Sequence, residues 1–124
     1  MRKVNISEKD GKKIALVESD TVAMYTYEDA LDILGDCMFN GVEHIIIRRE
    51  NVSPEFFDLK TGIAGDILQK FTTYKTSLAI VGDFGDVKSK SLRDFIRESN
   101  SQGRIIFLDS IEDAVSAFTG NPTQ

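Results

Sequence analysis

The feature that most restricts the fold of this chain is an alternation of short apolar runs with longer stretches of helical periodicity. Three such runs lie at 45–47, 78–82 and 104–108. Each run is too short for a helix and is rich in aliphatic residues, which is typical of a buried strand. Amphipathic segments fill the intervals between the runs. This order predicts an α/β fold whose mixed sheet is parallel in its later part and is connected by right-handed crossovers.

The amino-terminal segment predicts a β-hairpin in front of this alternation. Residues 4–8 alternate apolar and polar side chains, which is the period of a half-buried strand. Asp10-Gly11 is a strong turn signal, and the apolar run at 13–18 is the return strand. The predicted element order is therefore ββαβαβαβα in one domain over residues 1–120, followed by a disordered tail at 121–124.

The predicted helices carry recognisable start signals and apolar stripes. Thr26 is placed to cap a helix over residues 27–40, and either Ser89 or Ser91 is placed to cap the third helix. The second helix is expected from residue 61 or 62 to residue 74. The stripes expected to face the core are Ala30, Leu31, Leu34 and Met38 in the first helix and Ala64, Ile67, Leu68 and Phe71 in the second.

The composition excludes several classes of function. One histidine, His44, and one cysteine, Cys37, are too few for a zinc site built from such ligands, and we expect no metal and no cofactor. The formal net charge of -5 argues against a nucleic-acid partner. No apolar run reaches the length of a membrane span, and the first residues lack a signal-peptide pattern. We therefore expect a cytoplasmic protein without membrane contact.

A polar, glycine-containing segment before the second main helix is the first candidate site. Ligands of open α/β sheets bind beyond the carboxyl ends of the strands, near helix amino termini with unpaired N–H groups. Here Lys60 supplies a positive charge and Thr61 a hydroxyl, while Gly62 and Gly65 permit close approach of an anion. In the structural interpretation, Asp58 or Thr61 caps the helix and the glycines allow tight packing against the sheet.

The second candidate segment follows the fourth strand. Phe84 is expected either to form a lid or partner contact or to fold back onto the core, and Asp83 forms with Asp86 either an acid pair or ordinary turn chemistry. The next helix start adds hydroxyls and cations at Ser89, Lys90, Ser91 and Arg93. We expect the sheet to bring both helix starts to one edge, with Asp83 and Phe84 between them.

Three segments are specific enough to indicate a family. FFDLKTGIAGDILQKF (56–71), AIVGDF (79–84) and SKSLRDFIRESN (89–100) resemble the signature of the bacterial family called domain of unknown function 4180. The resemblance covers most of the chain, from Gly11 to the last helix. It implies a small bacterial, cytoplasmic protein, and it supplies no activity because the family has no established one.

The predicted element order is also similar to that of STAS domains, which are anti-sigma-factor antagonists. In that family a phosphorylatable serine follows an aspartate at the start of the helix after the third strand. The equivalent place here holds Asp58-Leu59-Lys60-Thr61-Gly62. The resemblance therefore implies Thr61 as the phosphoacceptor, although its hydroxyl stands three residues after Asp58 rather than next to it.

The leading functional hypothesis is a non-enzymatic regulatory module with a STAS-like fold. It would bind a protein partner through the edge formed by residues 58–65, 83–84 and 89–93. Phosphorylation of Thr61 would add negative charge beside the positive end of a helix, which is a tolerable place for it. The edge strand expected at 4–8 also makes a homodimer a reasonable form of partnership.

Two alternatives stay open. The first is a sensor or carrier of an anionic metabolite or nucleotide, which Lys60, Arg93 and the two helix amino termini would hold. The second is an enzyme with Asp58 or Asp83 as base and Lys60 or Lys90 as electrophile. No nucleophile and base are identified at a known geometry, so catalysis ranks below binding.

Overall fold

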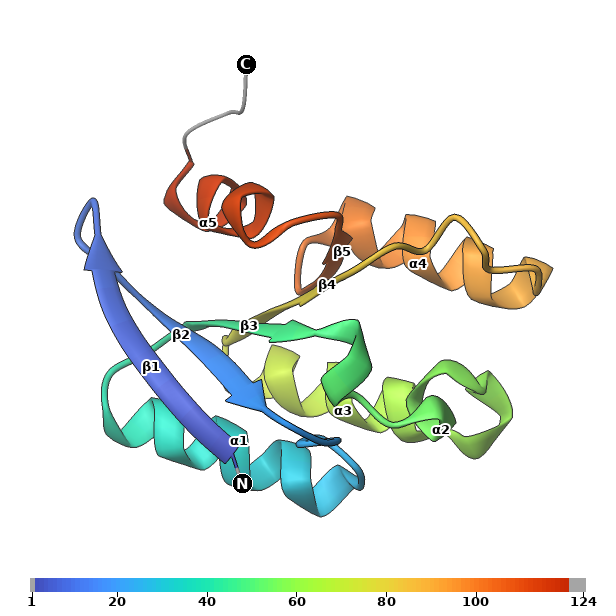
Figure 1. Ribbon diagram of the computed structural model, residues 1–124, viewed down its shortest axis with the longest axis horizontal. Helices are drawn as coiled ribbons and strands as arrows, with labels where there is room; N and C mark the ends of the chain where they lie inside the picture. Colours follow the sequence, from blue (N-terminus) through green and yellow to red (C-terminus); the bar gives the residue numbers. More distant parts are fainter. Residues whose placement is uncertain (1, 121–124) are drawn as a thin grey trace.

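A five-stranded mixed sheet in the sequential order β1-β2-β3-β4-β5 organises the molecule (Figure 1). The computed structural model describes residues 2–120, and the tail predicted at 121–124 lies outside them. The first two strands are antiparallel, and the turn between them takes positive φ at Asp10 and Gly11, as the turn signal predicts. The strands are β1 (Arg2–Lys9), β2 (Lys12–Ser19), β3 (His44–Arg48), β4 (Ser77–Val81) and β5 (Ile105–Leu108), with β2 to β5 parallel.

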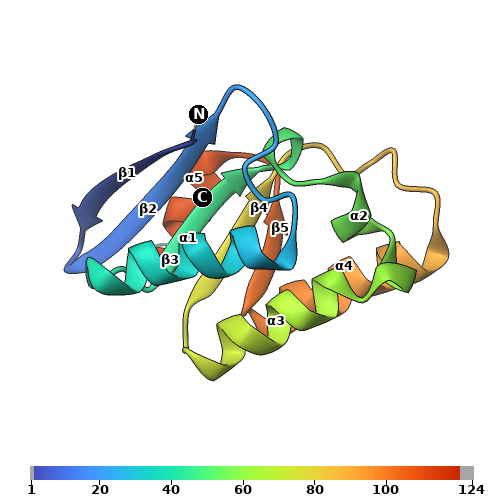
Figure 2. The same ribbon diagram turned by 90° about the horizontal axis from the view of Figure 1, so that it is seen from below.

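Helices cover both faces of the sheet. Figure 2 shows α1, α3 and α4 together on one face, with α5 on the other. The α/β class and the mixed sheet are confirmed, and α2 is the short helical turn that Pro54 initiates. The helices are α1 (Tyr27–Phe39), α2 (Pro54–Phe57), α3 (Ile63–Thr73), α4 (Lys90–Gln102) and α5 (Ile111–Thr119), with the 3-10 helices η1 (Arg49–Asn51) and η2 (Leu59–Thr61) on either side of α2.

Two apolar layers result from this arrangement. On the larger layer, β-strand side chains such as Val17, Ile45 and Ile80 pack against the helices α1 and α3. On the smaller layer, Ile46 of β3 belongs to a cluster with Phe118 of α5. Because both faces of the central strands are buried, these strands lose the alternation of polar and apolar residues that a half-exposed strand shows.

The helix caps agree with their sequence signals. Thr26 and Asp29 form a reciprocal capping box at the start of α1. Ser89, rather than Ser91, caps α4, because its hydroxyl accepts a hydrogen bond from the backbone N–H of Leu92 at 3.2 Å. These caps fix where α1 and α4 begin.

The buried stripe of α1 differs from the prediction. The core-facing residues are Ala30, Ile33, Leu34 and Cys37, whereas the predicted Met38 is 44% exposed. The prediction selected Met38 four residues after Leu34, and the helix instead buries the residue three after it. Burial raises the pKa of the Cys37 thiol to about 11, so the thiol is protonated at neutral pH.

Candidate functional site

The carboxyl ends of β3 and β4 border a pocket of about 490 Å³. Its position agrees with the rule that open α/β sheets bind ligands beyond the carboxyl ends of their strands. Aliphatic and aromatic side chains form part of its wall, and charged side chains form the rest. The lining residues are Val22, Arg49, Glu50, Val52, Pro54, Phe57, Gly82 and Asp83.

A clamp between two loops gives this pocket its shape. Asn51 is 3% exposed, and its side-chain nitrogen donates to the carbonyl oxygens of Ser19 at 2.9 Å and Thr21 at 2.7 Å. The carbonyl oxygen of Asn51 accepts hydrogen bonds from the N–H groups of Ala23 at 2.8 Å and Met24 at 3.0 Å. The segment after β3 and the loop after β2 are therefore held together on both sides of Val22.

These hydrogen bonds hold the segment that carries Arg49, whose side chain lines the pocket. Its guanidinium carbon lies 5.6 Å from the ring centre of Phe57 and 5.0 Å from that of Phe84. Nη1 donates to the carbonyl oxygen of Asp83 and to Oδ1 of Asp86, the latter at 2.9 Å. A guanidinium carries five donors in a planar fork, and these two bonds both use Nη1. The guanidinium of Arg49 is thus oriented by its neighbours, and its other N–H groups remain available to bind an anion.

Gly82 makes room for Arg49. A Cβ atom at position 82 would lie 2.8 Å from the Cβ of Arg49, which is closer than such atoms approach each other. The contact involves the root of the arginine side chain rather than its flexible end. Glycine at the end of β4 is therefore required for the observed path of the chain at Arg49.

The loop after β4 packs back onto the pocket wall. Phe84 is partly buried, and its ring meets the ring of Phe107 edge-on at 5.3 Å between centres. Of the two predicted alternatives for Phe84, the structure shows the one that folds back onto the core. Oδ1 of Asp83 accepts from the N–H of Gly85 at 2.8 Å, and the carboxylate of Asp86 bonds Arg49. The two aspartates thus have separate partners, which is turn chemistry rather than an acid pair.

Arg49 also affects the titration of Asp86. The hydrogen bond and the positive charge of Arg49 lower the pKa of the Asp86 carboxyl. Asp86 is exposed, so solvent screens the pair and its main effect is to hold the loop against the guanidinium.

The start of α3 uses its polar groups locally. The hydroxyl of Thr61 lies 2.8 Å from the carbonyl oxygen of Glu55 and 2.9 Å from that of Asp58, and it accepts from the N–H of Ile63 at 3.2 Å. Oδ1 of Asp58 accepts from the N–H of Lys60 at 3.3 Å. This segment is therefore a hydrogen-bonded turn with an exposed Lys60 at its surface.

The glycines of this segment do not pack tightly. Among residues 2–120, and apart from the chain neighbours and the backbone of the same helix, no atom lies within 4 Å of a Cβ placed at Gly62 or at Gly65, so the interpretation that they allow close packing against the sheet is wrong. Gly62 is needed for a different reason, since its φ of +78° lies in the left-handed region that favours glycine. Gly65 lies in the exposed first turn of α3, where the space around its Cα is open.

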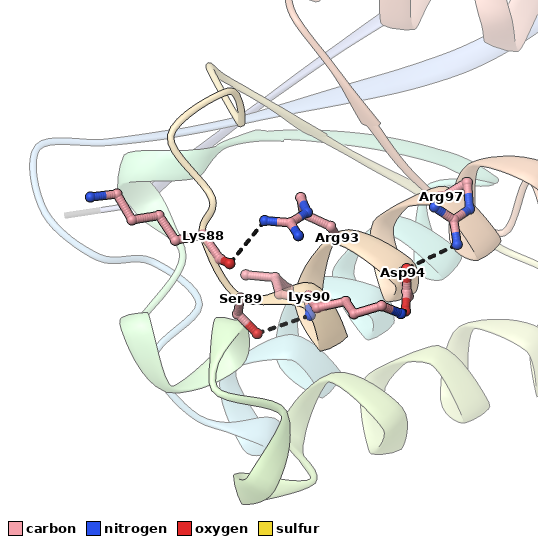
Figure 3. A network of polar contacts seen from close by, with 7 residues as sticks. Lys88, Ser89, Lys90, Arg93, Asp94 and Arg97 are labelled. Carbon is pink, nitrogen blue, oxygen red and sulfur yellow. Dashed lines mark hydrogen bonds and ion pairs between the residues drawn. The ribbon is translucent and has the colours of Figure 1, made fainter.

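The start of α4 likewise engages its cations within its own segment (Figure 3). Nη1 of Arg93 donates to the carbonyl oxygen of Lys88 at 2.8 Å. Lys90 pairs with Asp94 at 2.8 Å, and this pair raises the pKa of Lys90 and lowers that of Asp94. Arg97 approaches the other oxygen of Asp94 at 2.9 Å. Ser91 is exposed on the first turn.

The structure brings together only part of the predicted site. Asp83 and Phe84 join the group around Arg49, as expected for residues that follow β4. Within the described part of the chain, no hydrogen bond, ion pair or ring contact joins the segments 58–65 and 89–93. The sequence patterns did not identify Arg49 or Gly82 as site residues, and Phe57 entered only as part of the family-like stretch at 56–71.

Other chemically reactive side chains lie away from the pocket. His44 stands at the start of β3, where its ring stacks on Phe118 at 4.7 Å between centres, and burial together with Lys12 lowers its pKa. Among residues 2–120, no group of three or more His, Cys, Asp or Glu side chains is arranged to hold a metal ion. Over the same residues, no helix combines the length and apolar character that crossing a membrane requires.

Fold and pocket together define a small α/β protein with a ligand-sized cavity at the carboxyl end of its sheet. The chain belongs to the family described as domain of unknown function (DUF4180), whose sequence profile matches residues 9–118. The matched range includes every residue that lines the pocket. Among curated proteins and among solved structures, nothing matches the chain.

Proposed function

We propose that the protein is a non-enzymatic binding module, a sensor or carrier, whose pocket takes a small anionic ligand with an apolar part. The observation that carries the proposal is the guanidinium of Arg49, which two aromatic rings and an aspartate hold at the wall of the pocket. A guanidinium in a fixed plane suits bidentate binding of a carboxylate or phosphate. The proposal moves the anion-binding role from Lys60 and Arg93 to Arg49.

The remaining walls support a ligand that is partly apolar. Val22, Val52 and Pro54 give the pocket an aliphatic side, and a volume of about 490 Å³ lies within the range of small-molecule sites. Glu50 adds a negative charge to the lining, which favours ligands that carry a hydrogen-bond donor as well as an anionic group. Amphiphilic carboxylates and phosphorylated compounds are the classes that fit.

Binding is proposed in preference to catalysis because of the lining itself. Among residues 2–120, those that line the pocket include no serine, threonine, cysteine or histidine, so they offer no hydroxyl or thiol nucleophile and no imidazole base. Asp83, one of the two residues proposed as base in the enzyme hypothesis, accepts a hydrogen bond from the N–H of Gly85 on one carboxylate oxygen. These features suit recognition better than group transfer.

A thermal-shift screen with carboxylates and phosphorylated metabolites tests this proposal. A ligand at a hundredfold excess over its dissociation constant stabilises the folded state by about 2.7 kcal/mol, which raises Tm by several degrees. Arg49→Gln is expected to abolish the shift, and Arg97→Gln, which removes the same charge from the surface of α4, is expected to retain it. A shift that survives in Arg49→Gln, or that both variants lose equally, contradicts the proposal.

A second candidate is a regulatory module of STAS-like architecture that acts in the bacterial cytoplasm through a protein partner. Its support is the exposed Thr61, the last residue of η2, which lies two residues before the start of α3. Phosphorylation there would break the bonds of the Thr61 hydroxyl to two carbonyl oxygens and so change the shape of the turn. If Thr61→Ala and Thr61→Glu leave partner capture equal to that of the unmodified chain, this candidate fails.

A further inference from the structure

The two edges of the sheet differ in how their backbone groups are satisfied. At the β5 edge, the side chain of Asn100 bonds both backbone groups of Phe107: Oδ1 accepts from the N–H at 2.6 Å, and Nδ2 donates to the carbonyl oxygen at 3.3 Å. At Phe107 an amide side chain thus takes the place of a neighbouring strand. Such coverage is one of the ways in which proteins protect a sheet edge from further pairing.

The β1 edge has no such cover. In residues 2–120, β1 pairs with β2 on one side, and no other element forms a hydrogen bond with its outer backbone groups. Apolar side chains are exposed on this side of the molecule: Ile6 of β1 is 43% exposed and Phe39 of α1 is 91% exposed. Phe39 lies one turn after Asp36, which bonds Arg2 of β1 at 3.0 Å, so Phe39 belongs to the flank of α1 beside this edge.

We propose that the β1 edge binds a second copy of this chain, strand to antiparallel strand, about a two-fold axis at Asn5. Side chains opposite each other in such a pair share one face of the sheet, so only a few registers are allowed. With the axis at Asn5, Arg2 lies opposite the partner's Glu8, and Val4 lies opposite the partner's Ile6. Two ion pairs and two apolar pairs then form, because symmetry repeats each contact.

The charge pattern disfavours the neighbouring register in which the two-fold axis passes through Ile6. With the axis at Ile6, Lys3 would lie opposite the partner's Lys9, and Val4 opposite the partner's Glu8. Both pairings are unfavourable, the first by repulsion and the second by placing an apolar side chain against a charge. The proposal is independent of the ligand pocket, which lies at the ends of β3 and β4 rather than at the β1 edge.

Disulfide cross-linking tests the register directly. The proposed axis places the two copies of residue 5 directly opposite each other, at a separation that a disulfide spans. Asn5→Cys is therefore expected to form a covalent dimer on mild oxidation, and Ile6→Cys to form it much more slowly. The unmodified chain is the control, because its Cys37 is buried. Faster cross-linking of Ile6→Cys, or a lack of cross-linking in Asn5→Cys, overturns the proposed register.

Sedimentation of the unmodified chain and a charge variant tests the association itself. Glu8→Lys replaces both attractive pairs by repulsion and is expected to weaken dimerisation roughly tenfold. Glu98→Lys makes the same change on α4, away from β1, and is expected to dimerise normally. Circular dichroism checks that both variants are folded. A monomeric unmodified chain, or equal weakening in the two variants, overturns the proposal.

Discussion

The pocket at Arg49 and the helix starts at 58–65 and 89–93 contain similar residue types but use them differently. At the helix starts, Thr61, Asp58 and Arg93 bond the backbone of their own segments, within six residues along the chain. Arg49 instead bonds Asp83, 34 residues away, and lies over the ring of the adjacent Phe84 and over that of Phe57 in α2. Local bonds complete secondary structure, whereas contacts across the sequence hold a charge at the wall of a cavity.

The comparison also shows what a polar cluster in a sequence indicates. Hydroxyls, aspartates and glycines gather where helices begin, because unpaired N–H groups and sharp turns require them. A cation that lies over two neighbouring aromatic rings forms only after folding. A binding site is therefore better sought among side chains that the fold orients through distant contacts.

Two glycine substitutions test this contrast most strongly, because one is expected to lower folding stability and the other to raise it. Gly82→Ala places a Cβ against Arg49 and is expected to destabilise the fold by about 1–3 kcal/mol. Gly65→Ala meets no atom within 4 Å and is expected to stabilise α3 by about 0.5–1 kcal/mol. Urea unfolding of both variants measures the difference. If Gly82→Ala is as stable as the unmodified chain, the backbone at position 82 does not restrict the position of Arg49.

Arginine-to-lysine changes compare the two regions at constant charge. Arg49→Lys removes the planar group that stacks on two rings and is expected to cost about 1–2 kcal/mol of folding stability. Arg93→Lys keeps an ammonium that is able to reach the same exposed carbonyl oxygens, so we expect a change below about 0.5 kcal/mol. Chemical unfolding under identical conditions gives both values, and equal losses would contradict the contrast.

The hydroxyl of Thr61 offers a test within the start of α3. Thr61→Val keeps the shape of the side chain but removes its bonds to the turn, which we expect to cost about 1 kcal/mol. Thr61→Ser retains the hydroxyl and is expected to remain close to the unmodified chain. Thermal unfolding measures both. If valine is tolerated as well as serine, the hydroxyl does not hold the turn and is free for another role.

The smallest expected effect concerns pH. Arg49 lowers the pKa of Asp86 from its ordinary value of 3.8, so the folded-state pKa lies below the unfolded one. The pair therefore adds stability above the unfolded pKa, and this contribution disappears as the pH falls through the folded-state pKa. Titration of the Asp86 carboxyl by NMR is expected to show the lowered midpoint, which Arg49→Gln should return toward its ordinary value. An unchanged midpoint would show that the pair does not persist in solution.

Features that depend on neighbouring residues were predictable from the sequence. The turn at Asp10-Gly11, the helix cap at Thr26 and the apolar strand at 45–47 each follow from a few adjacent residues. The side of α1 that faces the core was less predictable, because Ile33 and Met38 differ little in apolar character and tertiary packing decides between them. The pocket was not predictable at the level of residues, since it depends on which segments become neighbours.

The amide of Asn100 has a consequence for how far this sheet is able to grow. A sheet with two uncovered edges adds strands at both ends, and repeated addition of identical chains then gives fibres. Here the outward backbone groups of Phe107 at one end are already bonded by a side chain that belongs to the same molecule. Strand addition is therefore disfavoured at this end, and a single symmetric addition at the opposite end leaves a ten-stranded sheet, two copies of the five strands, with a β5 strand bonded by Asn100 at each extremity. Asn100→Ala would remove that limit, and the first sign of it would be assemblies larger than two chains.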